Sequence, residues 1–160
     1  MSAIDHLDLV VSDLEASLDF YGGLLAPLGY VRRSEIVGER GERVVYLGHA
    51  TGGPSVSLRA RLSDAHEVPY DRYGIGLHHL AFAAASRAVV DERAAWLRER
   101  GAVIESGPRE YQYTPGYYAV FFHDPDGIKL ELLHRPSERD LLREVRELAA
   151  RVVQLEARLG

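Results

Sequence analysis

One carboxylate stands out because it lies in an otherwise apolar segment near the C-terminal end of the chain. Glu131 is flanked by Leu130 and Leu132 in the segment 128–134, IKLELLH, whose alternation is typical of a β-strand. A lone charge is costly to bury unless it is paired or bound to a metal ion. The sequence therefore predicts a partner for Glu131.

Two histidines in other predicted strands are the candidate partners. His6 lies in the segment 4–11 and His79 in the segment 77–84. Two neutral imidazoles and one carboxylate form a facial metal site that leaves coordination positions open for substrate, water or O₂. Divalent Fe or Mn suits this ligand set, and Zn, Ni and Co stay open as alternatives. A single strand histidine is more often a hydrogen-bonded core or rim residue, so it is their matching placement in a repeat that favours a metal site.

The repeat is an order of elements that occurs twice along the chain. Strand-like and helix-like patterns alternate as strand, helix and three strands, with glycine- and proline-containing turns between them. The predicted fold class is α+β, with two βαβββ modules at 1–60 and 76–136 and a linker at 61–75. Two such half-sheets can close on each other around a shared cleft.

The last two strands of the second module, at 117–123 and 128–134, form a predicted hairpin. Asp124–Gly127 has the composition of a tight turn. With that turn, Val120 lies opposite Glu131 and shares its face with Tyr118 and Phe122. These three residues are therefore predicted to line the cleft.

Further cleft residues follow from strand alternation and from an aromatic loop. Asp8 follows His6 on the same face, and Ala81 follows His79 and leaves room for a ligand. Tyr113 belongs to a tyrosine-rich segment that could close on a substrate, although packing at the base of a loop is an equally weighted explanation. The substrate-binding candidates are Ser57, Tyr118, Val120, Phe122, Tyr113, Asp8 and Ala81, and no catalytic residue is assigned.

The C-terminal segment 137–160 has a different character and is predicted to form an amphipathic helix. Its apolar residues are spaced alternately by four and three positions, as in a heptad seam: Leu141, Val145, Leu148, Val152, Leu155 and Leu159. Two interpretations stay open. The helix packs on its own domain, or it makes a contact between subunits.

Composition excludes several classes of partner. The net charge of −5 argues against nucleic acid and anionic membranes, and the chain has no cysteine for disulfides or thiol chemistry. No apolar run approaches the length that spans a membrane. The expected location is the cytoplasm, and the expected partner is a small-molecule substrate.

Three segments together resemble the vicinal oxygen chelate superfamily, which includes glyoxalase I, extradiol dioxygenases, and fosfomycin and bleomycin resistance proteins. They are IDHLDLVVSDLEASLDFY, GLHHLAFAA and FFHDPDGIKLELLH. The resemblance implies an open, U-shaped mixed sheet around a divalent metal, and a homodimer. His6, His79 and Glu131 match the family's ligand positions. His78 is expected to point to the opposite face.

The resemblance also has departures that bear on activity. Ser57 stands where glyoxalase I-like enzymes place a fourth ligand, and a serine hydroxyl is a poor metal ligand and a poor base at neutral pH. Phe121 stands where the extradiol signature has tyrosine. The function expected is a metal-dependent enzyme acting on a small oxygenated substrate, with a dioxygenase-like three-ligand site and not glyoxalase I itself. A dioxygenase-like reaction is placed ahead of isomerase, lyase or thiol-transfer chemistry.

The alternative is a non-catalytic protein that binds and sequesters a small molecule, such as an antibiotic, as bleomycin resistance proteins do. A second question concerns the cleft itself, which either lies within one chain or forms when two chains exchange modules. In an exchanged arrangement, His6 serves the site of the partner.

Overall fold

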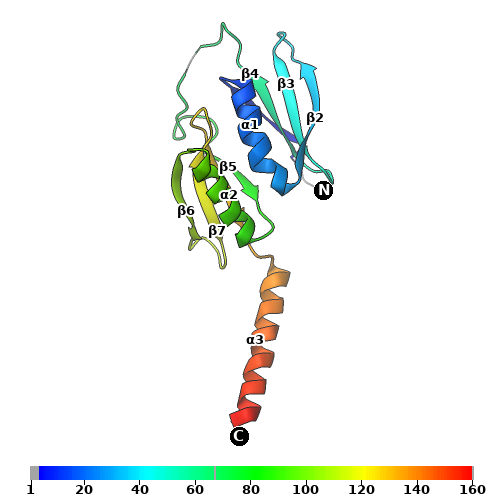
Figure 1. Ribbon diagram of the computed structural model, residues 1–160, viewed down its shortest axis with the longest axis vertical. Coiled ribbons are helices and arrows are strands. Elements are labelled where there is room, and N and C mark those ends of the chain that lie inside the picture. Colours follow the sequence, from blue (N-terminus) through cyan, green and yellow to red (C-terminus); the bar gives the residue numbers. More distant parts are fainter. Residues whose placement is uncertain (1–3, 67, 160) are drawn as a thin grey trace.

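Two modules of the same topology make up most of the molecule (Figure 1). The computed structural model describes residues 4–66 and 68–159. Module 1 contains β1 (His6–Val11), α1 (Leu14–Leu25), the 3₁₀ turn η1 (Ala26–Leu28), β2 (Tyr30–Val37), β3 (Arg43–His49) and β4 (Ser55–Ala60). Module 2 contains β5 (Leu80–Ala83), α2 (Arg87–Glu99), β6 (Ile104–Glu110), β7 (Tyr118–His123) and β8 (Lys129–His134). The predicted βαβββ repeat is confirmed, whereas the grouping of 1–136 as one domain stays a prediction.

Each module forms its own four-stranded mixed sheet, as expected for the predicted α+β class. The strand orders are β1-β4-β3-β2 and β5-β8-β7-β6. The first strand of each module pairs in parallel with the last, and the other pairs are antiparallel. Consequently β1, which begins at His6, and β5, which follows His79, are edge strands in the described chain.

The hairpin of β7 and β8 corrects one prediction. Phe121 pairs with Glu131, and Val120 pairs with Leu132. The turn is one residue longer than predicted, because the Asp124 carboxylate accepts the backbone N–H of Ile128 at 2.7 Å and draws it out of the strand. A one-residue change of register moves every side chain of a strand to the other face.

The three residues affected by this register therefore lie on the helix side of the sheet. Val120 and Phe122 are fully buried in the core, and Tyr118 packs against it. The Tyr118 hydroxyl donates to Asp91 of α2 at 2.7 Å. The prediction that Tyr118, Val120 and Phe122 share a face with Glu131 is wrong.

The two modules share one apolar core on their helix sides. Phe20 of α1 contacts Trp96 of α2, with ring centroids 6.1 Å apart, and also contacts Phe122 of β7. A Cβ on Gly23 would lie 2.4 Å from the Trp96 ring, so the close approach of the helices requires glycine there. The Tyr21 hydroxyl donates to Asp124 at 2.8 Å, which ties α1 to the β7–β8 turn. The two modules thus contact each other through the helix-covered side of each sheet.

The opposite side of each sheet is not covered by its helix. We call this side the open face of each module. The open face of module 1 carries Asp8 and Ser57, and the open face of module 2 carries Phe121 and Glu131. Their neighbours in sequence, such as Leu9, Leu58 and Leu132, are buried in the helix-side core. The candidate site residues must therefore be sought on these two open faces.

The last element is α3 (Glu138–Leu159), which extends away from module 2 as a single helix (Figure 1). Its capping is local, because the Ser137 hydroxyl accepts the backbone N–H of Asp140 at 3.1 Å and donates to the Asp140 carboxylate at 2.6 Å. Among the described residues, no helix is both long and apolar enough to cross a membrane.

Candidate metal and substrate site

The open face of module 2 gives Glu131 the partners that its burial requires. Its side chain is 3% exposed, and one carboxylate oxygen lies 3.2 Å from Nε2 of His79. The Tyr117 hydroxyl donates to the other oxygen at 2.6 Å. Burial, together with this hydrogen bond, raises the pKa of Tyr117 well above its usual value, so the phenol remains a donor. Glu131 is therefore held between an imidazole and a phenol.

Tyr117 is a site residue that the sequence did not identify as a partner of Glu131. It lies just before β7, in a loop where strand alternation does not predict the direction of a side chain. The only signal was its place in a tyrosine-rich segment. Its position in the structure makes it the group that orients the Glu131 carboxylate.

Aromatic rings form a wall beside this pair. The Phe121 ring meets the His79 ring edge-on, with centroids 6.3 Å apart. Tyr111 packs edge-on against Phe121 and stacks on Tyr113, which in turn contacts Tyr117. Tyr113 is 65% exposed. Tyr113 thus belongs to an aromatic cluster that reaches Tyr117, the partner of Glu131, and its predicted role in substrate binding stays a prediction.

Lys129 lies on the same face as Glu131 but is engaged elsewhere. Its Nζ lies 2.7 Å from Glu105, which also pairs with Arg72 at 2.6 Å and lies 3.3 Å from His123. The Lys129 ammonium, aided by Arg72, lowers the pKa of Glu105 to about 2. Among the described residues, no lysine or arginine is paired with Glu131.

The open face of module 1 is built on the same plan with different side chains. Asp8 accepts a hydrogen bond from Ser57 and pairs with Arg59 at 3.0 Å, and Arg59 also pairs with the buried Glu42. The hydrogen bonds from Ser57 and Arg59 hold the pKa of Asp8 below its usual value despite partial burial, which acts in the opposite direction. The charges of this face are thus satisfied within the module.

His6 lies at the edge of this face and is half exposed. Its Nδ1 lies 2.8 Å from the Asp5 carboxylate, and this hydrogen bond is the main reason why the pKa of His6 is raised. The His6 and Tyr46 rings are 6.3 Å apart at 69°. His79 and Phe121 have the same separation and the same angle. The two histidines therefore occupy equivalent places in the two modules.

The strand register assigns the counterparts on the two faces. Asp8 pairs with Ser57 in module 1, and Ala81 pairs with Glu131 in module 2. Because Asp8 and Ala81 each lie two residues after a candidate histidine, Ser57 is the counterpart of Glu131. Ala81 is exposed, and its methyl group is smaller than the side chain of Asp8 at the equivalent place in module 1.

The two faces do not combine into one metal site within a single chain. Among residues 4–66 and 68–159, no group of three or more His, Cys, Asp or Glu side chains could hold a metal ion. His79 and Glu131 are adjacent, but His6 does not join them. One chain therefore brings together two of the three predicted ligands, and the metal site stays a prediction.

The placement of His78 differs from expectation. β5 begins at Leu80, so His78 and His79 both precede the strand and strand alternation does not separate them. Their Nδ1 atoms are 2.7 Å apart, and the His78 ring also contacts Tyr73. His79 remains the histidine whose Nε2 faces Glu131.

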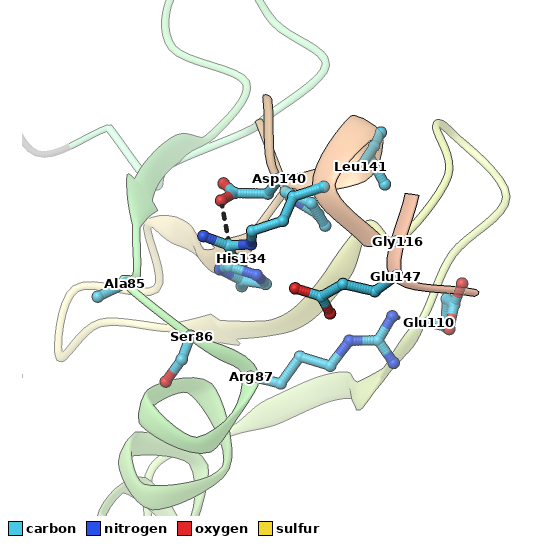
Figure 2. Close-up of a pocket in the computed structure, with 11 residues that line it drawn as sticks. Ala85, Ser86, Arg87, Glu110, Gly116, His134, Asp140, Leu141 and Glu147 are labelled. Atoms are coloured by element: carbon cyan, nitrogen blue, oxygen red, sulfur yellow. Dashed lines mark hydrogen bonds and ion pairs between the residues drawn. The ribbon is translucent and has the colours of Figure 1, made fainter. Parts of the chain in front are cut away.

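Two of the cavities that border the modules lie at the sheet edges and at the base of α3. An apolar one of about 660 Å³ lies along the edge strands β1 and β5 and is lined by residues such as Leu7, Leu80 and Ala81. The other, of about 840 Å³, lies at the base of α3, where Figure 2 shows the Arg87 side chain directed toward Glu110. Its arginines are paired with acidic neighbours, Arg87 with Glu110 and Arg143 with Asp140. It therefore presents no concentrated charge to a ligand.

Comparison with known proteins gives the family. The model of the Glyoxalase/Bleomycin resistance protein/Dioxygenase superfamily matches residues 3–132. The chain is 37% identical over 132 residues to the uncharacterized protein YqjT of Bacillus subtilis, covering 80% of this chain and 95% of that protein. It is 30% identical over 138 residues to a lactoylglutathione lyase of Neisseria meningitidis, covering 84% and 92%.

A solved structure agrees with this assignment. The crystal structure of a putative glyoxalase from Bacillus halodurans superposes with a TM-score of 0.71 at 33% identity, covering 83% of this chain and 96% of that one. The family match extends over both modules and ends before α3. The chain therefore belongs to the glyoxalase/bleomycin resistance protein/dioxygenase superfamily.

Proposed function

We propose that this protein is a metal-dependent enzyme acting on a small oxygenated substrate, with His79 and Glu131 as metal ligands. The observation that carries the proposal is the buried Glu131 carboxylate, which faces Nε2 of His79 at 3.2 Å. A carboxylate so deeply buried needs a cation or donors, and the imidazole and phenol around it provide only part of that compensation. Divalent Fe or Mn suits the ligand set, with Zn, Ni and Co as alternatives.

The third ligand in this proposal is His6 of a second copy of the chain. Contacts within one chain use the helix sides of the sheets, which leaves β1 and β5 as edges beside an apolar cavity. Open strand edges and apolar surface favour pairing with another chain. An exchanged homodimer would place β1 of one copy beside β5 of the other and would bring His6 to the His79–Glu131 pair.

The residues of the chain have distinct roles in this account. A bound divalent ion would act as a Lewis acid toward a substrate oxygen. Tyr117 orients Glu131 by its hydrogen bond, and the tyrosine and phenylalanine rings provide flat apolar surface for the substrate. The small side chain of Ala81 leaves space beside the His79–Glu131 pair.

Ser57 is the reason why we do not propose the reaction of the lactoylglutathione lyase relative. Its hydroxyl donates to Asp8, which is already paired with Arg59. A hydroxyl held in this way is neither a competent base nor a good metal ligand. We expect no lactoylglutathione lyase activity from the purified protein, and activity of that kind at an ordinary enzymatic rate would overturn this part of the proposal.

Elemental analysis of protein purified without chelators or added metal tests the proposal directly. The wild-type protein should retain a divalent metal, whereas Glu131→Gln and His79→Ala should lose it. His66→Ala is the matched control because His66 is exposed in the segment between the modules. Absence of metal from the wild type, together with failure to bind added Fe, Mn, Ni, Co or Zn, would contradict the proposal.

The second candidate function is sequestration of a hydrophobic small molecule without catalysis. The cluster of Tyr111, Tyr113 and Tyr117 and the apolar cavity beside β5 favour it. It predicts that His79→Ala leaves the affinity for such a ligand unchanged. A large loss of affinity in that variant would count against sequestration and in favour of the metal site.

A further inference from the structure

Helix α3 presents an apolar stripe that nothing in the described chain covers. Val145, Leu148, Val152 and Leu155 are 52–62% exposed. Figure 1 shows the helix leaving module 2 and running clear of both sheets. Contact with the module is limited to its base, where Leu141 lines the cavity shown in Figure 2.

The stripe has the residue types of a two-stranded coiled coil. Its spacing assigns Val145 and Val152 to heptad position a, and Leu141, Leu148 and Leu155 to position d. β-Branched residues at a with leucine at d favour parallel dimers over higher oligomers. The seam of a and d residues is also narrower than the face that a helix buries against a globular domain, although Leu142 at position e and Val153 at position b are exposed as well.

The flanking charges fit a second copy of the same helix. Arg151 occupies position g, and Glu156 occupies position e of the following heptad. In a parallel, in-register pair, each g residue lies beside the following e residue of the partner, so Arg151 of each copy would meet Glu156 of the other. Both side chains are exposed, and they are five residues apart on one helix, where they do not face each other.

We propose that α3 pairs with α3 of a second copy to form a parallel, in-register two-stranded coiled coil. At 22 residues the helix is about 33 Å long. A coil this short is weak between free helices, but dimerisation elsewhere in the chain would raise the effective concentration of its two strands. The inference does not depend on metal binding, because its residues are remote from Glu131.

Cysteine cross-linking tests the pairing and its direction. The chain has no cysteine, so a single introduced thiol can link only to its copy. Leu148→Cys and Leu155→Cys, made separately in the full-length protein, should each form covalent dimers under mild oxidation. Ala150→Cys, on the outer face at position f, is the control and should not.

The outcomes separate the alternatives. Both position-d variants can link efficiently only in a parallel pair, because no antiparallel register aligns both residues with their copies. Linking of one but not the other, or linking no better than Ala150→Cys, would overturn the proposal.

A charge reversal tests the partner as well as the geometry. In the Leu148→Cys background, Arg151→Glu and Glu156→Arg should each weaken pairing by roughly tenfold, because two ion pairs become two repulsions. The double variant should restore the pairing. If the single reversals have no effect, or if the double variant stays as weak as either single one, the helix does not pair with its copy in this register.

Discussion

The two open faces share a backbone plan and differ in how their charges are satisfied. Both place a histidine 6.3 Å from an aromatic ring at 69°. In module 1, the carboxylate of Asp8 is neutralised by Arg59, and the counterpart of Glu131 is Ser57. In module 2, Glu131 is buried between His79 and Tyr117. The duplication thus preserves the geometry, but in the part of the chain that the structure describes Asp8 is paired with an arginine, whereas the buried Glu131 is paired with neither a lysine nor an arginine.

The largest expected effect is a loss of metal affinity in a variant of Glu131 that a variant of its counterpart, Ser57, does not share. Glu131→Gln should lower affinity for the divalent metal by at least ~100-fold, because it removes a charged ligand. Ser57→Ala should leave that affinity within ~3-fold, because Ser57 supports Asp8 and not the metal. Competition titration with a chromophoric chelator measures both. Equal losses in the two variants would show that the faces contribute alike.

A smaller difference in metal affinity is expected between variants of Tyr117 in module 2 and Tyr46 in module 1. Tyr117→Phe removes the donor to Glu131 and should weaken metal binding by about 10-fold, as loss of an orienting hydrogen bond does. Tyr46→Phe keeps the ring beside His6 and should change metal affinity by less than ~2-fold. The same titration applies, with thermal unfolding as a check on folding. A larger loss in Tyr46→Phe than in Tyr117→Phe would reverse the assigned roles.

The smallest expected effect concerns pH. The pKa of Glu105 is lowered to about 2 in the folded state from an ordinary value of 4.5. A lowered carboxyl pKa stabilises the fold above the unfolded pKa, and that stabilisation is lost as the pH falls from about 4.5 towards about 2. Glu105→Gln should therefore cost about 1 kcal/mol at pH 6, after allowance for solvent screening.

The pH dependence of that cost is the informative measurement. Urea unfolding of the Glu105→Gln variant and the wild type at pH 6 and at pH 3 should show the difference shrinking at the lower pH. A difference that is constant or grows as the pH falls would mean that Lys129 and Arg72 do not hold Glu105 in its charged form. Lys129 would then be available to pair with Glu131 instead of with Glu105.

Local signals in the sequence predicted much of the fold. The bounds of β2 and β4 follow from alternation and from the glycine- and proline-containing turns beside them. The hairpin register was missed because the Asp124 side chain captures Ile128, which is an interaction of turn geometry and not of composition. Tyr117 was missed as a partner of Glu131 for a similar reason, because a loop residue has no periodicity to fix its direction.

The relation between the modules lay beyond sequence reasoning. Phe20 and Trp96 each fit the apolar stripe of their own helix, and no local pattern shows that the stripes meet. Their contact brings the helix sides of the sheets together and leaves His6 apart from Glu131. Sequence reasoning named the three candidate ligands but left open whether one chain could assemble them.

Complementation between two variant chains tests the central claim most directly. His6→Ala and Glu131→Gln chains, carrying different tags and co-expressed, are purified as the mixed dimer for metal analysis. In an exchanged dimer, the mixed species regains one intact site, so its metal content should be about half that of the wild type, while each variant alone holds almost none. A mixed dimer without metal would contradict a site shared between chains, and metal retained by His6→Ala alone would show that His6 is not a ligand.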